Sequence, residues 1–390
     1  METFPTIWVA GSSRDRGRAY GEQARDRIAR SIEAYEEVFR AYAGWDWAQV
    51  RREAARYQAP IAGFDERYLE EMRGIAQGAA LDLEDILSIN VRTEVMFAAK
   101  ARAAEAASRT GGDGQRQGEC SAFAVLPEAS ADGHTLLGQN WDWLLHCFDT
   151  VVVLAVEQAD RPNFVSVVEA GLLAKTGMNS SGLGVATNAL VTDTDRGDPG
   201  VPYHVVLRAF MDCENLSDAL SAVQRGVRSS SANYLVAHAD GVAVDMETAP
   251  GDFSRVLLEY PDDGVALHTN HFRSPSFDGR DVSLWVMPDS PFRLQRLSAA
   301  VRRSRPKGLS LDTFRGVLGD HANYPSGICC HPDARMDPHD QGATVASVLM
   351  DLTDRRIWLA DGHPCTTPYR ELDVGTLLDK PSPVKEGMPA

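Results

Sequence analysis

Apolar side chains recur at three- and four-residue steps through the first part of the chain. Between residues 15 and 45 they fall on one face of a helix, and the segment 64–107 continues in the same manner. Asp82 and Glu84 come just before Ile86, and acidic residues favour the start of a helix. We therefore predict that roughly the first hundred residues are mainly helical. The apolar positions of the first long helix are Ala24, Ile28, Ile32, Tyr35, Val38, Phe39 and Tyr42.

From Cys120 onward the pattern changes to short β-rich runs, many of them separated by Gly, Asp or Asn turns. Helical stretches interrupt these runs at 201–226, 291–304 and 310–321. Strands grouped in blocks and helices grouped in blocks favour a layered α+β fold over a parallel βαβ sheet. The predicted strands are SAFAVL, HTLLGQNW, TVVVLAVEQ, NFVSVVEAG, GLGVATNAL, NYLVAHADG, VAVDMETA, RVLLEY, GVALHTNH, ATVASVLMD and RRIWLAD.

A change in composition separates the helical part from the strand-rich part. The stretch ASRTGGDGQRQ, residues 107–117, is small, polar and glycine-rich, which is typical of a linker. We predict a helical segment over 1–119 that ends in this flexible linker and a catalytic part over 120–390. Both are expected to form one globular unit, and the last dozen or so residues have the composition of a loose tail.

Charge and composition narrow the range of partners. The formal net charge is −16, and no stripe of Lys and Arg with interleaved aromatics is present, which argues against nucleic acid. The first residues lack a signal-peptide pattern, and the run VVVLAV is far shorter than the roughly 18 residues of a membrane span. The six cysteines are scattered, so we expect thiols in a cytoplasmic protein.

Common enzyme motifs such as G-x-S-x-G, the P-loop, H-E-x-x-H and paired C-x-x-C are absent from the sequence. His268 and His271 in LHTNHF are three residues apart, a spacing that suits two metal ligands on a helix. This segment instead has the pattern of a strand leading into a turn, where the spacing does not place both rings on one side. We expect neither a metal nor a cofactor, and a metal-dependent amidase is the weakest alternative.

Cys120 lies where the linker meets the first predicted strand. It could be a buried packing residue, as free cysteines commonly are. If the chain is cut immediately before it, however, Cys120 gains a free α-amine, whose ordinary pKa of about 8 suits a general base. One residue then carries both nucleophile and base. Asp142 in GQNWDW, on the next predicted strand, would hold the thiol or the ammonium in position, unless it is a turn or surface carboxylate.

A series of motifs, in order along nearly the whole chain, resembles the acyl-coenzyme A:6-aminopenicillanic acid acyltransferase family, cysteine members of the N-terminal nucleophile hydrolases. The resemblance implies an αββα sandwich, two stacked antiparallel sheets between helix layers. The motifs are GRAYGEQA, IARSIEA, EMRGIAQGAALDLEDILSINVRTE, GQNWDW, EAGLLAKTGMNSSGLGVATNAL, GVPYHVVLR, HTNH, NYPSGIC and GAT.

The resemblance also implies roles for individual residues. Cys120 would be the nucleophile, exposed by self-cleavage of the bond from Glu119, and Asp142 would orient it. Asn270 in HTNH matches the asparagine whose side-chain N–H stabilises the oxyanion, and Asn188 in ATNAL is a weaker candidate for the same task or a structural turn residue.

Two positions depart from the family pattern. The family commonly has glycine before the nucleophile, where this chain has Glu119, and glycine adopts the strained peptide that self-cleavage needs most easily. The penicillin-processing members carry arginine before Gly-Ala-Thr, where this chain has Gln341. The missing charge argues against the penicillin substrate itself, although Gln341 remains a candidate for contact with substrate.

We therefore predict a self-processing cysteine amidohydrolase or N-acyltransferase that cleaves or forms a small amide bond through an acyl-Cys120 intermediate. Its partner would be a small amide or acyl donor, and its own two fragments would associate after cleavage. The alternative is an unprocessed, non-catalytic relative that binds a small acyl or amide ligand, and Glu119 and Gln341 favour it.

Overall fold

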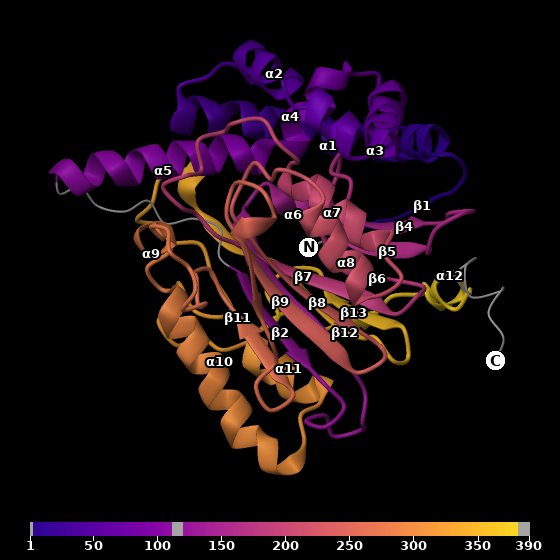
Figure 1. Cartoon of the computed structure of the whole chain (residues 1–390), viewed down its shortest axis with the longest axis vertical. Coiled ribbons are helices and arrows are strands. Elements are labelled where there is room, and N and C mark those ends of the chain that lie inside the picture. The colour runs from indigo at the N-terminus through magenta and orange to yellow at the C-terminus, as the bar shows by residue number, and fades with distance from the viewer. Residues whose placement is uncertain (1–2, 111–119, 381–390) are drawn as a thin grey trace.

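A computed structural model describes residues 3–110 and 120–380 of the chain. In its described part the strands form two sheets with helices on both outer sides (Figure 1). The N-terminal helices form the upper layer of the picture, and α10 and α11 lie on the other side of the sheets. The predicted α+β class and the αββα layering are confirmed.

The larger sheet has the strand order β1-β4-β5-β6-β7-β8-β9-β10. Its neighbours pair antiparallel except β1 and β4, which are parallel. The strands are β1 (Thr6–Val9), β4 (Val151–Val156), β5 (Phe164–Glu169), β6 (Thr176–Asn179), β7 (Leu183–Ala189), β8 (Ala232–His238), β9 (Val242–Thr248) and β10 (Val256–Glu259).

The smaller sheet has the order β11-β2-β3-β12-β13-β14 and is antiparallel throughout. Its strands β2 and β3 pack face to face on β7 of the larger sheet, and all three strands are buried along their whole length. The strands are β2 (Cys120–Val125), β3 (Leu136–Leu144), β11 (Val265–His268), β12 (Gly342–Asp351), β13 (Arg356–Ala360) and β14 (Arg370–Glu371).

The N-terminal helices cover the larger sheet, and two of them cross at unusually short range. A Cβ atom on Gly17 would lie 2.2 Å from the carbonyl oxygen of Glu71, and one on Gly74 would lie 2.3 Å from that of Arg14. Only glycine permits this approach of α1 and α3. The helices of this layer are α1 (Ser13–Ala43), α2 (Trp47–Ala55), α3 (Gln58–Ala79), α4 (Leu83–Asn90), α5 (Arg92–Thr110), α7 (Tyr203–Met211) and α8 (Leu216–Gln224).

Helices α10 (Ser290–Ser304) and α11 (Leu311–Leu318) cover the smaller sheet. Their apolar faces form a second core with the strands, in which the rings of Phe123 and Phe314 stack with centroids 3.5 Å apart. The short helices α6 (Cys147–Thr150), α9 (Ser283–Val286) and α12 (Gly375–Leu378) lie in connections.

Several elements differ from the sequence prediction. Strands β1, β6 and β14, which contain two or four residues each, were not predicted. The single helix predicted over 201–226 is two, α7 and α8, separated at 212–215. Helix α5 continues to Thr110, past the predicted start of the linker, and the rest of the linker and Glu119 lie outside the described residues.

The segment before Cys120 is built into the same core as the segment after it. Strand β1 extends the larger sheet by pairing with β4. The buried Arg92 lies 3.3 Å from the Glu169 carboxylate, and the Tyr35 hydroxyl donates to the same carboxylate at 2.9 Å. A charge buried in this way needs its partner close by, so these contacts join the two segments firmly.

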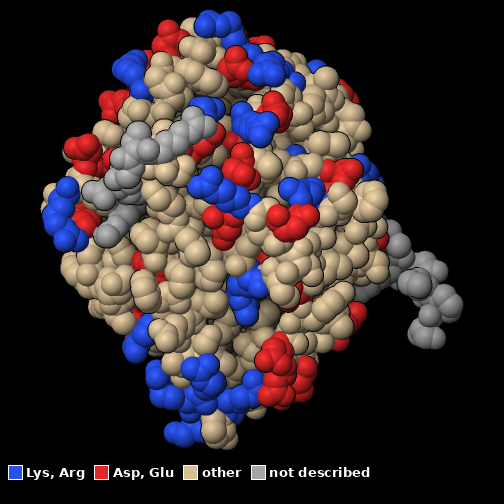
Figure 2. Space-filling view, turned by 60° about the vertical axis from the view of Figure 1, so that its left-hand side comes forward, with Lys and Arg blue, Asp and Glu red and all other residues tan. Residues whose placement is uncertain are grey.

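Acidic and basic side chains are mixed over most of the face shown in Figure 2. Basic side chains gather at its lower end, where α10 ends in Figure 1 with Arg302 and Arg303 in its last turn. No helix in the described ranges is both long enough and apolar enough to span a bilayer.

Candidate active site

Cys120 is the first residue of β2 and is buried, with 3% of its surface exposed. Its strand partner is Trp141 on β3, so Asp142 lies one residue further along the neighbouring strand. The backbone N–H of Cys120 donates to Oδ1 of Asn270 at 2.7 Å. A side chain distant in sequence thus holds the nitrogen that cleavage before Cys120 would convert into an α-amine.

Arg293 holds the other side of the Cys120 backbone. From α10, its guanidinium donates to the Cys120 carbonyl at 2.7 Å and to Oδ1 of Asn270 at 3.0 Å. Its Nε donates to Asp289 at 2.6 Å, and Arg293 is itself 1% exposed. This buried, hydrogen-bonded guanidinium fixes Cys120 and Asn270 relative to each other. We did not predict a role for Arg293 from the sequence.

Asp142 is a buried carboxyl with one strong partner. Thr344 on β12 donates its hydroxyl to Oδ1 at 2.5 Å, while Oδ2 has no hydrogen-bond partner among the described residues. Burial raises the pKa of Asp142 to about 8, although Arg293 and Thr344 both act to lower it. The backbone N–H of Asp142 also acts on the Cys120 sulfur, lowering the pKa of the thiol. The predicted proximity of Asp142 and Cys120 is present.

Lys175 is a cation beside Cys120 that sequence reasoning missed. It is 5% exposed, and its Nζ lies 4.7 Å from the centroid of the Trp141 ring. Burial lowers the pKa of Lys175 to about 8. Burial likewise raises the pKa of the Cys120 thiol, and Lys175 is the largest influence that opposes this rise. The thiolate of Cys120 is therefore stabilised by a nearby positive charge.

The two asparagines predicted for the oxyanion site meet at the end of β7. Asn270 uses Oδ1 to accept from Cys120 and donates from Nδ2 to the carbonyl of Ala189 at 3.0 Å. Asn188, next to Ala189, accepts at Oδ1 from Asn233 at 3.3 Å, while its Nδ2 has no hydrogen-bond partner among the described residues. In this structure the oxygen of the Asn270 amide faces Cys120, and Asn188 carries the unpaired donor.

Unpaired buried polar atoms gather on the strands around Cys120. Folded proteins pair most such atoms, so each exception on these strands is a candidate contact for a polar ligand. The atoms without a hydrogen-bond partner among the described residues are Nε2 of Gln139 and Nε1 of Trp141 on β3, Oδ2 of Asp142 on β3, Nδ2 of Asn188 on β7 and Oδ1 of Asn233 on β8. Of these residues, Trp141 is the strand partner of Cys120, and Asp142 follows it on β3.

The family model of the acyl-coenzyme A:6-aminopenicillanic acid acyltransferase matches residues 129–365. The chain belongs to this family. It is 26% identical over 362 residues to the 40 kDa form of acyl-coenzyme A:6-aminopenicillanic-acid-acyltransferase from Emericella nidulans, and 92% of each chain is covered. The match to the family model includes Asp142, Asn188 and Asn270 but begins downstream of Cys120.

Two solved structures also resemble this member of the acyltransferase family. One is a mutant of conjugated bile acid hydrolase from Clostridium perfringens, with 13% identity, a TM-score of 0.45 and coverage of 66% of this chain and 94% of that chain. The other is penicillin V acylase from Agrobacterium tumefaciens, with 13% identity, a TM-score of 0.44 and coverage of 67% of this chain and 88% of that chain.

Gln341 lies just before β12, where the resemblance would place the arginine of penicillin-processing family members. Its Nε2 donates to the carbonyl of Met336 at 3.2 Å, so this contact is within its own loop. No hydrogen bond among the described residues joins Gln341 to Cys120 or Asp142. Its role in substrate binding stays a prediction.

The side chains of His268 and His271 contact different residues. His268 Nε2 lies 2.9 Å from the carboxylate of Glu247, and His271 Nδ1 lies 2.7 Å from the hydroxyl of Ser290. They do not form a metal-ligand group among the described residues. Ser290 also accepts from the backbone N–H of Asn270 at 2.7 Å, so this segment positions Asn270.

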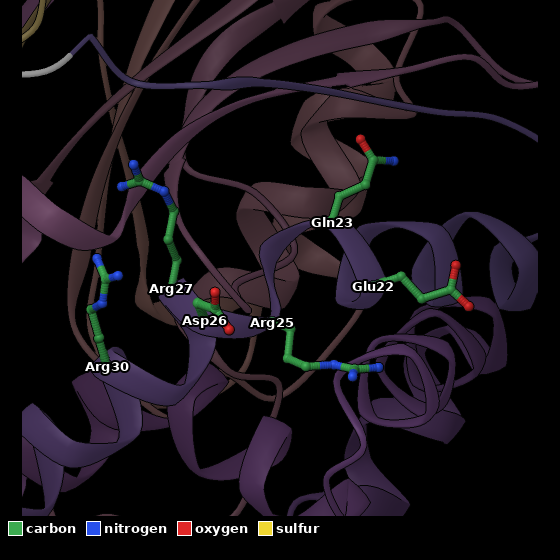
Figure 3. A pocket seen from close by; sticks show the side chains of 6 residues that line it. All are labelled: Glu22, Gln23, Arg25, Asp26, Arg27 and Arg30. Carbon is green, nitrogen blue, oxygen red and sulfur yellow. The ribbon is translucent and has the colours of Figure 1, made fainter.

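A separate hollow lies on α1 (Figure 3). It is lined by side chains of one helix, with acidic and basic groups mixed, namely Glu22, Gln23, Arg25, Asp26, Arg27 and Arg30. Arg27 already donates to the carbonyl of Asp149 at 2.6 Å. None of these residues belongs to the group around Cys120.

Proposed function

We propose that this family member is a self-processing cysteine amidohydrolase or N-acyltransferase that acts on a small linear amide through an acyl-Cys120 intermediate. The observation that carries the proposal is the 2.7 Å contact between the Cys120 nitrogen and the side chain of Asn270, inside a group of unpaired buried polar atoms.

Maturation begins when the Cys120 sulfur attacks the carbonyl carbon of Glu119. The S–C bond forms, the C–N bond breaks, and a proton passes to the nitrogen, which leaves a thioester. Water then hydrolyses the thioester and releases the carboxylate of Glu119 and the thiol and α-amine of Cys120. Arg293 and Asn270 support this step because they fix the backbone on both sides of the sulfur.

In turnover the α-amine takes the proton of the thiol, and the sulfur attacks the carbonyl of the substrate amide. The negative oxygen of the tetrahedral intermediate needs N–H donors. Asn188 Nδ2 supplies one, and Asn270 supplies a second through the Nδ2 hydrogen that does not go to Ala189. The α-ammonium protonates the departing amine, and water or a second amine then takes the acyl group from the sulfur.

Lys175 and Asp142 support the nucleophile from two sides. The ammonium of Lys175 stabilises the thiolate, and Trp141 holds Lys175 in place by a cation–π contact. Asp142 is fixed by Thr344 and presents its backbone N–H toward the sulfur. Lys175 acts by its charge, and Asp142 acts by positioning.

The two fragments are expected to stay together after cleavage. The N-terminal segment supplies β1 of the larger sheet and the buried Arg92 that faces Glu169. Separation would expose the apolar faces of α1–α5 and leave Glu169 without its cation, which is costly.

Intact-mass analysis of the purified protein tests self-processing. Two polypeptides that meet at Glu119 and Cys120 and elute together from a sizing column support the proposal, and Cys120→Ala should remain one chain. A wild-type chain that stays whole for as long as it turns over an amide would show that catalysis does not use a free α-amine. A whole chain without turnover would leave ligand binding as its function.

A further inference from the structure

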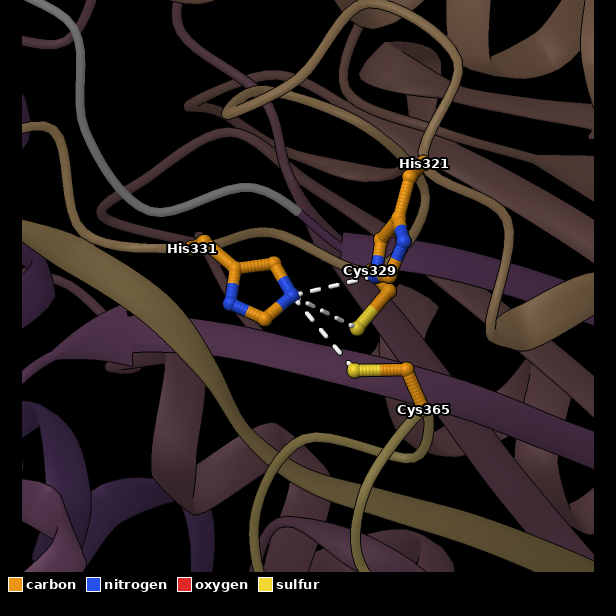
Figure 4. A group of neighbouring side chains, drawn as sticks. All are labelled: His321, Cys329, His331 and Cys365. Carbon is orange, nitrogen blue, oxygen red and sulfur yellow. Dashed lines mark hydrogen bonds between the residues drawn. The ribbon is translucent and has the colours of Figure 1, made fainter.

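Four metal-ligating side chains converge in loops at the end of the smaller sheet (Figure 4). They are His321, Cys329, His331 and Cys365, whose donor atoms all lie within 4.8 Å of one another. Three come from the connection between α11 and β12, and Cys365 comes from the connection between β13 and β14. None of them belongs to the group around Cys120.

The three distances from His331 Nε2 to the other ligand atoms are close to the edges of a coordination tetrahedron. Nε2 of His331 lies 3.1 Å from Nε2 of His321, 3.6 Å from Sγ of Cys329 and 3.5 Å from Sγ of Cys365. Zinc binds imidazole nitrogen at about 2.0–2.1 Å and thiolate sulfur at about 2.3 Å, so a tetrahedron around it has N–N edges of about 3.3 Å and N–S edges of about 3.5 Å.

Hydrogen bonds among these groups account poorly for the arrangement. Nε2 of His331 can make only one hydrogen bond, because it has either one hydrogen or one lone pair. Three potential ligand atoms nevertheless face it, and two of them are sulfurs. Convergence of four lone pairs on one region is instead the arrangement around a bound ion. In Figure 4 the two rings and the two sulfurs point toward one another.

We propose that His321, Cys329, His331 and Cys365 bind one structural zinc ion. Two thiolates and two neutral imidazoles balance the charge of Zn²⁺, and binding releases the two thiol protons. Soft sulfur and imidazole ligands select zinc over magnesium or calcium. A set of four protein ligands leaves no open position, which is typical of a structural site.

The surrounding side chains and backbone support the four ligands. The ring of His363 stacks on that of His331 with centroids 4.4 Å apart. The backbone N–H of Cys329 donates to the Asp320 carbonyl at 3.0 Å, and that of His331 donates to the Pro325 carbonyl at 2.9 Å. Such outer contacts set the orientation of metal ligands before the ion binds.

The proposed zinc site adjoins the candidate active site through the backbone. Cys330, between two of the ligands, donates its N–H to the Thr344 hydroxyl at 2.9 Å, and Thr344 donates to Asp142 at 2.5 Å. An ion that fixes Cys329 and His331 therefore also fixes the group that holds Asp142. The bound ion would hold the loop between α11 and β12 against the loop between β13 and β14, beside Cys120.

Metal analysis of the purified full chain tests the proposal. After gel filtration in metal-free buffer, the wild type should retain one zinc per chain, and Cys329→Ser/Cys365→Ser should lose most of it. Cys213→Ser is the matched control, because the Cys213 thiol is also buried but lies in the main core and donates to the Ala209 carbonyl. This control should keep the zinc of the wild type.

Cobalt replacement gives a readout that does not depend on the stability of the variant. Wild-type protein freed of metal and loaded with Co²⁺ should show the intense visible absorption of tetrahedral cobalt with thiolate ligands. Zinc that persists in the double variant, a cobalt spectrum without thiolate bands, or a Cys329–Cys365 disulfide found by peptide mapping of the wild type would each overturn the proposal.

Discussion

The surroundings of Cys120 differ from those of Cys329 and Cys365. Cys120 begins strand β2, whereas Cys329 and Cys365 lie in loops. Cys120 has a lysine ammonium, a guanidinium-held backbone and an asparagine oxygen around it. Cys329 and Cys365 instead face the imidazole nitrogen of His331. Cations beside a sulfur favour a nucleophilic thiolate, whereas neutral nitrogen and a second sulfur favour a shared metal ion.

The two regions also differ in how they are built. The Cys120 region is set into paired strands and a helix, with β2, β3, β7 and α10 each contributing, so its geometry follows from the layered fold. The proposed zinc site is made by loops, which have no ladder of hydrogen bonds to fix them. The proposed nucleophile is fixed by the sheet, whereas the proposed loop site would gain rigidity from the ion.

Removing the cysteines of one region should abolish the property of that region and leave the other region's property in place. Cys120→Ala should abolish both self-cleavage and turnover, because it removes the sulfur that attacks in each step, while its zinc content should match that of the wild type. Cys329→Ser/Cys365→Ser should show the reverse, with zinc lost and acylation of Cys120 slowed but present. Mass analysis and metal analysis of the same samples check both halves. Turnover by Cys120→Ala would mean that another group is the nucleophile.

Asn188→Ala should lower kcat by roughly 10²–10³ with little change in KM, which is the usual effect of removing one oxyanion donor. The reason is its Nδ2, the unpaired buried donor at the end of β7 among the described residues. Steady-state kinetics on a small N-acyl anilide measures kcat and KM separately. Asn233→Ala is a useful comparison, since Asn233 touches Asn188 but is not proposed to meet the oxyanion. A change confined to KM would assign Asn188 to binding of the ground state.

Lys175→Met should raise the pKa of the Cys120 thiol, because it removes the positive charge that favours the thiolate. The acid limb of the pH–rate profile, and the pH dependence of alkylation of Cys120 by iodoacetamide, should both move to higher pH. Lys175→Arg should restore much of the wild-type profile. Lys380→Met, which removes an exposed ion pair with Glu157, serves as the control and should leave the profile unmoved. An unchanged profile in Lys175→Met would limit Lys175 to packing.

The sequence predicted the features that depend on neighbouring residues, but not those that depend on the tertiary fold. Alternating runs predicted most strands, and the change of pattern at Cys120 predicted the division of the chain, because both depend on neighbouring residues. Lys175 and Arg293 escaped notice because only the tertiary fold brings them to Cys120. The spacing of Arg293 from Asp289 is that of an ordinary helical ion pair, which says nothing about a site.

The metal-ligating group escaped sequence reasoning for a related reason. Cys329 and His331 are two residues apart, but His321 lies further back along the chain and Cys365 comes from another loop. The spacing matches no common zinc motif, and we expected no metal. We considered His268 and His271 as metal ligands from the sequence. In the structure His268 contacts Glu247 and His271 contacts Ser290.

A separate prediction concerns the pH dependence of stability and rests on Asp142, which connects the two regions through Thr344. Burial raises the pKa of this carboxyl from its ordinary value of 3.8 to about 8, so the folded chain retains a proton that the unfolded chain loses. Stability should therefore fall as pH rises from about 4 to about 8. Asp142→Asn should flatten this fall in Tm against pH while lowering activity. An equal slope in variant and wild type would show that Asp142 is already ionised in the folded protein.

Trapping the acyl-enzyme shows directly whether Cys120 carries the acyl group. Wild-type protein is mixed with a small N-acyl substrate, quenched in acid within the turnover time, and digested for mass spectrometry. We expect an acyl group in a thioester on Cys120, at the N-terminus of a polypeptide that begins with that residue, and no adduct in Cys120→Ala. An acyl group on any other residue, or turnover without a covalent adduct under conditions that trap thioesters, would contradict this expectation.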